Sequence, residues 1–286
     1  MVSFRNSQFQ AILVGMMIAD AVSQGQLPWH TCTQATTAAL EDASAGRMAN
    51  DDWCHAIAAA LDPSSSHQVS LTAAPLQSCD WTEEFTSDLS TTNALLAHLP
   101  QVLSHLDRYP PQLATQQYPA TTDPVAITVI FYACLQASFR QDTATLSAWR
   151  QQLQLESTTA QQSSHVELSV AIEALLAAHG DYQLAVGQCL QLSATAPGSV
   201  ILTAILSASW GDLPSVPMRY RHWLQQPPPA LQEWLQRRWH IATSDCLMRW
   251  AETLWQQWSG QHPTALVRSP LVPIQPLSPS AKLPTL

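Results

Sequence analysis

The amino-acid composition predicts an all-α protein that forms a single multi-helix domain. Alanine and leucine, the strongest helix formers, are abundant along the 286 residues, and only 8 glycines occur. Few segments combine β-branched residues with alternating polarity, so strands are not expected as a major component. A chain of this length buries roughly 70–75% of its unfolded surface. The expected core therefore needs neither a disulfide nor a metal ion.

Hydrophobic periodicity divides the chain into a series of expected helices. The first covers residues 5–24, where apolar side chains recur at helical spacing. Asp123 followed by Pro124 is typical of a helix start, and the strongly apolar run that follows, to about Phe139, predicts a central buried helix. Gly180 and Gly211 lie where C-terminal caps are expected. The other expected helices cover residues 29–45, 51–61, 82–105, 142–155, 165–179, 182–192 and 199–210.

The domain is expected to end in a tail. Residues 63–80, rich in Ser, Pro and Ala, predict a long loop. Residues 230–258 form an additional Trp-rich helical region with an apolar stripe, which is typical of a helix packed on a core or on a partner. Residues 259–286 repeat proline without periodicity and predict disorder. We therefore expect a helical domain over residues 5–258 and a disordered tail over 259–286.

The charge balance argues against nucleic acid as a partner. The formal net charge is −9, and the sequence holds no basic stripe that would neutralise phosphates. The nearest approach to a basic cluster is formed by four arginines, which we interpret as a solvated helix face: Arg219, Arg221, Arg237 and Arg238.

The distribution of cysteines and apolar runs favours a cytoplasmic protein without a membrane partner. The 6 cysteines are scattered and show no C-x-x-C spacing, which fits a reducing compartment. The apolar run ending at Ala19-Asp20-Ala21 mimics a signal peptide, but Gln8 and Gln10 interrupt its approach and an acid in the cleavage motif is unfavourable. A packed first helix is the better interpretation. No apolar run reaches the about 18 residues that a membrane span needs.

Three segments carry patterns that point to a known family when they are taken together. The first covers residues 9–23 and includes Gly15 and Asp20, the second covers 31–43, and the third covers 181–223. In this order and spacing they resemble the motifs of the ADP-ribosylglycohydrolase family. The resemblance implies that family's all-α fold for the helical domain.

The resemblance also implies a magnesium site whose acids this chain lacks. The family is understood to cleave the bond to ribose with two magnesium ions, which carboxylates on two loops hold. In the early loop a cysteine and a threonine replace the acids, and in the late loop two alanines do. Asp20 remains, but one acid does not hold two magnesium ions. We therefore expect no catalytic residue and no cofactor, and a vestigial pocket formed by Asp20, Thr31, Cys32, Thr33, Ala194, Thr195 and Ala196.

The sequence leaves open two other sets of residues that could bind a metal ion. Asp51 and Asp52 supply an acid pair that would restore magnesium binding, although helix N-termini favour acids for dipole reasons alone. A second set has ligand types suited to zinc but no recognised zinc spacing: His30, Cys32, Cys54 and His55.

The resemblance leads to a non-catalytic protein as the first hypothesis. Such a protein either keeps a cleft for ADP-ribose or a related nucleotide, or serves as an interaction module. One alternative is an active magnesium-dependent ADP-ribosyl hydrolase with a rearranged acid set, in which Asp20, Asp51 and Asp52 act together. Another alternative is an assembly protein that docks on a protein partner through its C-terminal Trp-rich helix.

Overall fold

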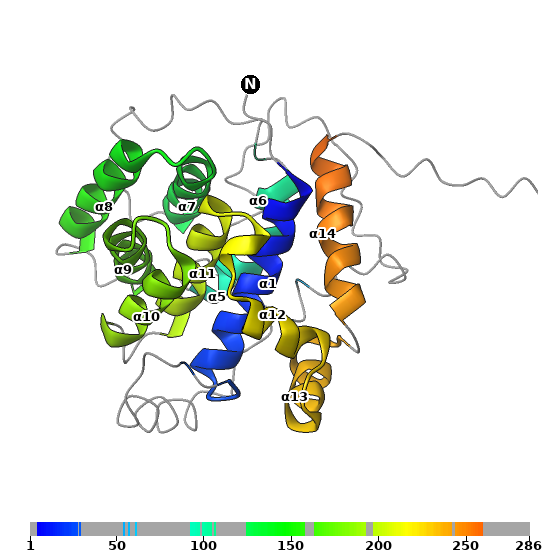
Figure 1. Ribbon diagram of the computed structural model, residues 1–286. Coiled ribbons are helices and arrows are strands. Elements are labelled where there is room, and N and C mark those ends of the chain that lie inside the picture. The colour runs from blue at the N-terminus through cyan, green and yellow to red at the C-terminus, as the bar shows by residue number, and fades with distance from the viewer. Residues whose placement is uncertain are drawn as a thin grey trace, which may run out of the picture.

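The part of the chain that the structure describes is all-helical, as the composition predicts (Figure 1). This computed structural model describes residues 5–27, 29, 54, 57, 61, 92–97, 99–104, 106, 124–157, 163–192, 197–241 and 244–259. The helices in these ranges are α1 (Asn6–Ser23), α5 (Thr92–Ala97), α6 (Leu99–Ser104), α7 (Pro124–Phe139), α8 (Thr143–Ser157), α9 (Ser163–Ala177), α10 (Tyr182–Leu192), α11 (Pro197–Trp210), the 3₁₀ helix η2 (Leu213–Ser215), α12 (Met218–Gln225), α13 (Pro229–Trp239) and α14 (Ser244–Ser259). Among these residues, none forms a helix that combines the length and apolarity needed to cross a bilayer.

Helix α1 lies at the centre of the molecule, between α11 and α14 (Figure 1). Every residue from Ala11 to Ser23 is buried, and all of them except Asp20 and Ser23 are apolar, so the helix is enclosed on all sides. The Gln8 side-chain amide donates a hydrogen bond to the Ser209 carbonyl at 3.4 Å. The start of α1 therefore lies beside the end of α11, and the two helices run antiparallel. The expected packed first helix is thus a core element.

Gly15 allows a close approach in the middle of α1. A Cβ atom on Gly15 would lie 2.9 Å from the ring of Tyr182 and 3.1 Å from the Cβ of Ala208. The Tyr182 hydroxyl donates a hydrogen bond to the Gly15 carbonyl at 2.7 Å. The glycine is thus required by packing, since α10 and α11 both press on the same turn of α1.

Helices α7, α9 and α10 cover the other side of α11, and α8 packs on α7 and α9 (Figure 1). Helix α7 begins at Pro124 and ends at Phe139, as the sequence predicts, and nearly all of its side chains from Ile127 onward are buried. Two serines join it to α11: the Ser138 hydroxyl donates to the Leu206 carbonyl at 2.5 Å, and the Ser209 hydroxyl donates to Ser138 at 2.9 Å. These short side chains let the two helices approach closely while their hydroxyls stay hydrogen-bonded.

At the ends of α9 and α11, where glycine caps are predicted, the first residue with a positive φ is not the glycine. After α9, His179 takes the left-handed conformation with φ 51°, and Gly180 follows it with φ 81°. The His179 and Gly180 amides donate to the carbonyls of Leu176 and Leu175, which is a Schellman arrangement. After α11, the positive φ belongs to Asp212 rather than to Gly211.

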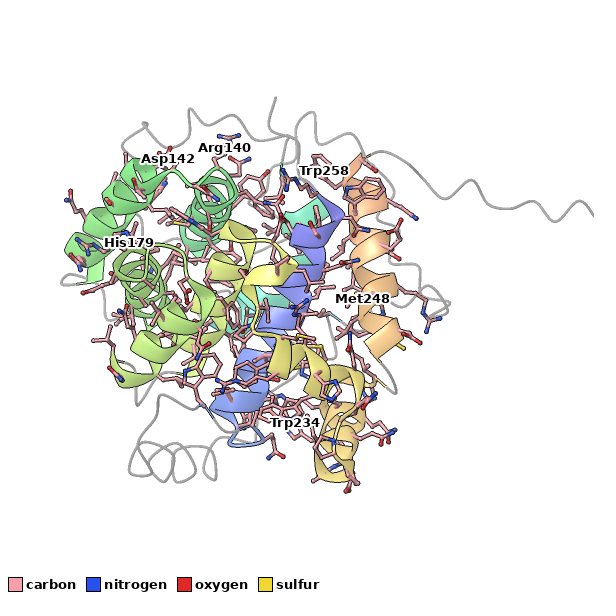
Figure 2. The ribbon with its side chains drawn as sticks, viewed as in Figure 1. Arg140, Asp142, His179, Trp234, Met248 and Trp258 are labelled. Carbon is pink, nitrogen blue, oxygen red and sulfur yellow. The ribbon has the colours of Figure 1, made fainter. Side chains whose placement is uncertain are left out.

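The Trp-rich region forms two helices, and the one that carries the apolar stripe packs on the core. Helix α14 contacts α1 and α6, and its buried side chains are Leu247, Trp250, Ala251 and Leu254. Trp258 lies near the far end of α14 (Figure 2), and its ring centroid is 6.1 Å from that of Phe9. Helix α12, which precedes this region, is an element that the sequence analysis does not predict.

Several predicted elements fall on residues that are not described. Cys54, Ile57 and Leu61 are helical and buried, in agreement with the helix expected over residues 51–61. Residues 92–97 and 99–104 are helical within the predicted 82–105 span. The helix expected over 29–45, apart from Trp29, the loop over 63–80 and the tail beyond residue 259 lie outside the described residues.

Candidate functional site

Asp20 is the one residue of the expected pocket that the structure describes. It lies in the last turn of α1 and its side chain is fully buried. The other residues proposed for the pocket or for the alternative acid set lie outside the described part of the chain: Thr31, Cys32, Thr33, Asp51, Asp52, Ala194, Thr195 and Ala196. Of the zinc-type set, only Cys54 is described.

The antiparallel packing of α1 and α11 sets the surroundings of Asp20. Because the start of α1 lies beside the end of α11, the end of α1 that carries Asp20 points toward the beginning of α11, at Pro197. Helix α10 ends at Leu192, and the residues between it and α11 lie outside the described part of the chain.

The carboxylate of Asp20 is held by the last two residues of α13. The Arg238 guanidinium donates twice, from Nε to Oδ2 at 2.6 Å and from Nη2 to Oδ1 at 2.8 Å. The Trp239 indole nitrogen donates to Oδ2 at 2.9 Å. The Cys54 thiol lies 3.9 Å from the same oxygen. Both carboxylate oxygens are therefore hydrogen-bonded to groups that are more than 200 residues away in the sequence.

The local sequence of α13 explains how Arg238 and Trp239 reach this position. Pro229 is favourable in the first turn of a helix, and the buried side chains Leu231, Trp234, Leu235 and Trp239 recur at helical spacing. Arg238 lies in the last turn, where the helix dipole favours a cation. The helix ends at Trp239 and is followed by His240, which takes the left-handed conformation with φ 52°. The apolar face thus seats α13 and aims its C-terminal end at Asp20.

Burial makes this ion pair different from an ordinary surface pair. The side chains of Arg238 and Asp20 are 12% and 0% exposed. A carboxylate in such a place is costly unless a cation and further hydrogen bonds compensate it. The bidentate guanidinium supplies the charge, and the indole N–H supplies an additional donor. Arg238 and Trp239 of the same chain therefore offset the cost of burying the Asp20 carboxylate.

The solvated-face interpretation of the four arginines is wrong for Arg238. Its side chain is nearly buried, because it must accompany the carboxylate that it neutralises. The neighbouring Arg237 does fit that interpretation: it is 70% exposed and lies 3.7 Å from Glu233, one helical turn away. Two adjacent arginines of the same helix therefore have different roles.

An aromatic cluster that the sequence does not predict surrounds Tyr182, which contacts Gly15 in the middle of α1. Trp29 stacks on Tyr220 of α12 with ring centroids 4.9 Å apart. The Trp29 ring is also tilted against the Tyr182 ring, with centroids 6.4 Å apart. Trp223 packs edge-on against Tyr220. Burial, with a contribution from the neighbouring Tyr220, holds the pKa of the Tyr182 phenol well above its usual value. Tyr182 therefore acts as a neutral hydrogen-bond donor to Gly15.

The described residues around Asp20 do not fit a resident magnesium ion. Magnesium requires several oxygen ligands in near-octahedral geometry. Here both oxygens of Asp20 already accept hydrogen bonds from cationic or N–H donors, which a metal ion in the same place would repel. Across the ranges that the structure describes, no three His, Cys, Asp or Glu side chains come together as a metal-binding group.

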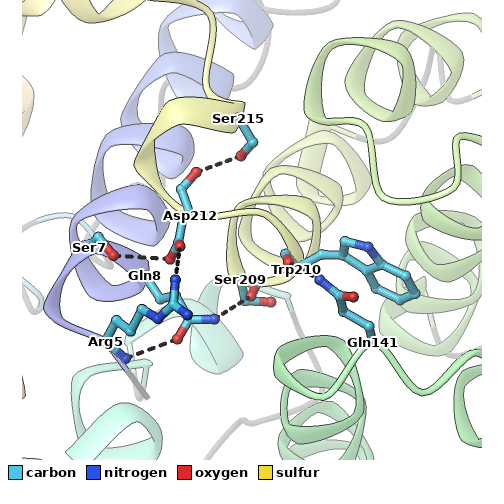
Figure 3. Close-up of polar contacts among 8 residues, drawn as sticks. All are labelled: Arg5, Ser7, Gln8, Gln141, Ser209, Trp210, Asp212 and Ser215. Atoms are coloured by element: carbon cyan, nitrogen blue, oxygen red, sulfur yellow. Dashed lines mark hydrogen bonds and ion pairs between the residues drawn. The ribbon is translucent and has the colours of Figure 1, made fainter. Parts of the chain in front are cut away.

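A second polar cluster lies at the opposite end of α1 (Figure 3). Arg5 lies 3.1 Å from Oδ2 of Asp212, and the Ser7 hydroxyl donates to Oδ1 of the same carboxylate at 3.0 Å. The Ser215 hydroxyl donates to the Asp212 carbonyl at 2.7 Å. These contacts fix the turn after α11 against the start of α1. The cluster is accessible to solvent, since Arg5 is 73% exposed.

No protein-family model, curated protein or solved structure matches the chain.

Proposed function

We propose that this protein is a non-catalytic, metal-independent protein that resembles the ADP-ribosylglycohydrolases. The observation that carries this proposal is the occupation of Asp20, the acid retained from the first motif, by Arg238 and Trp239. Hydrolysis with two magnesium ions needs carboxylates that are free to ligate metal. A carboxylate neutralised by a buried guanidinium does not provide that ligand.

The same arrangement favours a binding role. In this proposal the end of α1, with the adjacent aromatic cluster, forms the wall of a cleft for ADP-ribose or a related nucleotide. The support is the position of Asp20 toward the beginning of α11 and the cluster of Trp29, Tyr220 and Trp223, which meets α1 through Tyr182, because aromatic side chains are common in ligand sites. The existence of this cleft is therefore also proposed.

Calorimetric titration of the full chain with ADP-ribose, with and without magnesium, tests this function. The proposal predicts binding that is the same in both conditions and no release of ADP-ribose from a modified protein. Binding that requires magnesium, or magnesium-dependent release that is lost in Asp20→Ala, would contradict it. An absence of binding in both conditions would leave the interaction-module form of the hypothesis and exclude the nucleotide cleft.

One observation favours the hydrolase alternative as a second candidate. The Cys54 thiol is 3.9 Å from Asp20, and Asp51 and Asp52 precede Cys54 by three and two residues. This alternative predicts magnesium-dependent hydrolase activity that Asp51→Asn and Asp52→Asn both abolish. Equal and background-level activity of the parent protein and both variants would exclude it.

Docking through the C-terminal Trp-rich helix receives less support. The apolar stripe of α14 packs on α1 and α6 within the same molecule, so it is not free to receive a partner. A protein partner would have to bind the outer faces of α13 and α14 instead.

A further inference from the structure

We propose that Asp20, Trp239 and Trp234 form a guanidinium-binding site, which the chain fills with its own Arg238. The ligand class is a planar guanidinium cation. The Asp20 carboxylate accepts hydrogen bonds from two N–H groups of one guanidinium. It accepts a third from the Trp239 indole N–H, and the Trp234 ring lies beside the cation. The site follows from these contacts and does not depend on the proposed function.

The geometry of the carboxylate favours guanidinium over other cations. Nε and Nη2 of Arg238 reach the two different oxygens at 2.6 and 2.8 Å, which is the two-pronged pairing of a planar fork with a carboxylate. An ammonium ion is a compact, strongly hydrated point charge and does not make this pairing. A divalent metal ion needs several oxygen ligands, whereas the Trp239 N–H already uses part of the capacity of Oδ2.

The aromatic side chain adds to this preference. The Cζ atom of Arg238 lies 5.9 Å from the centroid of the Trp234 ring, within the range of a cation–π interaction. A guanidinium is weakly hydrated and packs against aromatic faces, so leaving water costs it less than it costs an ammonium ion. Trp234 lies on α13, one turn before Arg238 (Figure 2). The same helix therefore supplies the cation and the ring beside it.

Removing the Arg238 side chain would open this site to small molecules. In the parent protein the Arg238 side chain is 12% exposed and Asp20 is 0% exposed, so the space that Arg238 leaves connects with solvent and reaches the carboxylate that Arg238 covers. Removing one partner of a buried, hydrogen-bonded charge pair is strongly unfavourable. The variant would therefore be destabilised and would bind an external guanidinium of matching size.

Chemical rescue of Arg238→Ala by methylguanidinium tests the site. The midpoint of thermal unfolding is measured at low millimolar methylguanidinium chloride, where the denaturing effect of guanidinium is small, and at equal concentrations of methylammonium chloride and magnesium chloride. We expect methylguanidinium to raise the midpoint and the other two salts to have little effect. At about ten times its dissociation constant, methylguanidinium increases the ratio of folded to unfolded protein about elevenfold.

Matched variants separate the site from general salt effects. Arg237→Ala removes the adjacent exposed arginine and should show no rescue. The double variant Asp20→Asn, Arg238→Ala lacks the carboxylate and should lose the rescue. If Arg238→Ala does not fold alone, its refolding yield with each of the three salts is measured instead. Equal effects of the three salts, a stronger effect of magnesium, or rescue that persists without Asp20 would overturn the proposal.

Discussion

The two ends of α1 each hold an arginine–aspartate pair that joins residues more than 200 positions apart, yet the pairs differ in every physical respect. At the N-terminal end, Arg5 and Asp212 are 73% and 31% exposed and share one contact at 3.1 Å. At the C-terminal end, Arg238 and Asp20 are 12% and 0% exposed and share two short hydrogen bonds. The first pair borders solvent, and the second belongs to the core.

The difference shows that burial, rather than residue type, decides what an ion pair does. An exposed pair contributes about 0–1 kcal/mol, because water screens it and two long side chains must be ordered. A buried pair has little net benefit compared with apolar residues, but losing one partner leaves a charge that nothing compensates. We therefore expect the two ends of α1 to respond very differently to the same kind of substitution.

Arg238→Met should produce the largest effect. The substitution keeps an unbranched side chain but removes the guanidinium that pairs with the buried Asp20, so the free energy of unfolding should fall by about 3–5 kcal/mol. Denaturant unfolding followed by circular dichroism measures the loss. A loss below about 1 kcal/mol would place this pair in the same class as Arg5–Asp212.

Gly15→Ala, in the middle of α1, should have the next largest effect. The added methyl group would meet the Tyr182 ring and the Ala208 side chain, and overpacking of this kind costs about 1–3 kcal/mol. The better helix propensity of alanine offsets less than about 1 kcal/mol of this. Thermal unfolding checks the sign: a variant more stable than the parent would show that the packing around α1 relaxes easily.

Asp142 is a third carboxylate, and its partners are local in the sequence. It caps α8 by accepting hydrogen bonds from the Thr145 hydroxyl at 2.6 Å and the Thr145 amide at 3.0 Å, and these bonds lower its pKa. Asp142→Ala should cost about 1 kcal/mol at neutral pH.

The pH dependence of that effect has a definite sign. Because the pKa of Asp142 is lower in the folded state, its contribution is present above the unfolded pKa of about 3.9 and is lost as the pH falls through the folded pKa. Unfolding curves of the parent protein and Asp142→Ala at several pH values should therefore converge in acid. A difference that stays constant down to low pH would show that the ionised carboxylate is not the source.

Arg5→Ala should have the smallest effect. The exposed pair with Asp212 contributes at most about 1 kcal/mol, and added salt should reduce the difference further. The comparison of unfolding in low and high salt provides the measurement. A loss as large as that of Arg238→Met would remove the contrast between the two ends of α1.

The fold was largely predictable where the signals are local. Pro124 and the apolar run after it define α7, and helical periodicity places α10 at the bounds that are observed. Helix α12 was missed, because it has only eight residues, half of them polar, and prolines flank it. A short helix of this kind is stabilised by tertiary packing, here through Tyr220 and Leu224, rather than by its own pattern.

The site was predictable only in part. The family resemblance identified Asp20 as a candidate site residue. It did not identify the partners Arg238 and Trp239, because nothing in the local sequence indicates which distant cation a buried acid will contact. The adjacent arginines Arg237 and Arg238 have similar surroundings in the sequence, and only the packing of α13 distinguishes them. A buried acid in a chain with 12 basic residues does require a cationic partner, and that requirement is the one signal available in advance.

The most direct measurement of the central claim is a double-mutant cycle at Asp20 and Arg238. The free energy of unfolding is measured for the parent protein, Asp20→Asn, Arg238→Met and the double variant, and the same cycle is made with Asp212→Asn and Arg5→Met. If the guanidinium is the cation that satisfies Asp20, the coupling energy at the buried pair should be about 2 kcal/mol or more, against less than about 1 kcal/mol at the exposed pair. Equal coupling energies at the two ends of α1 would contradict the account.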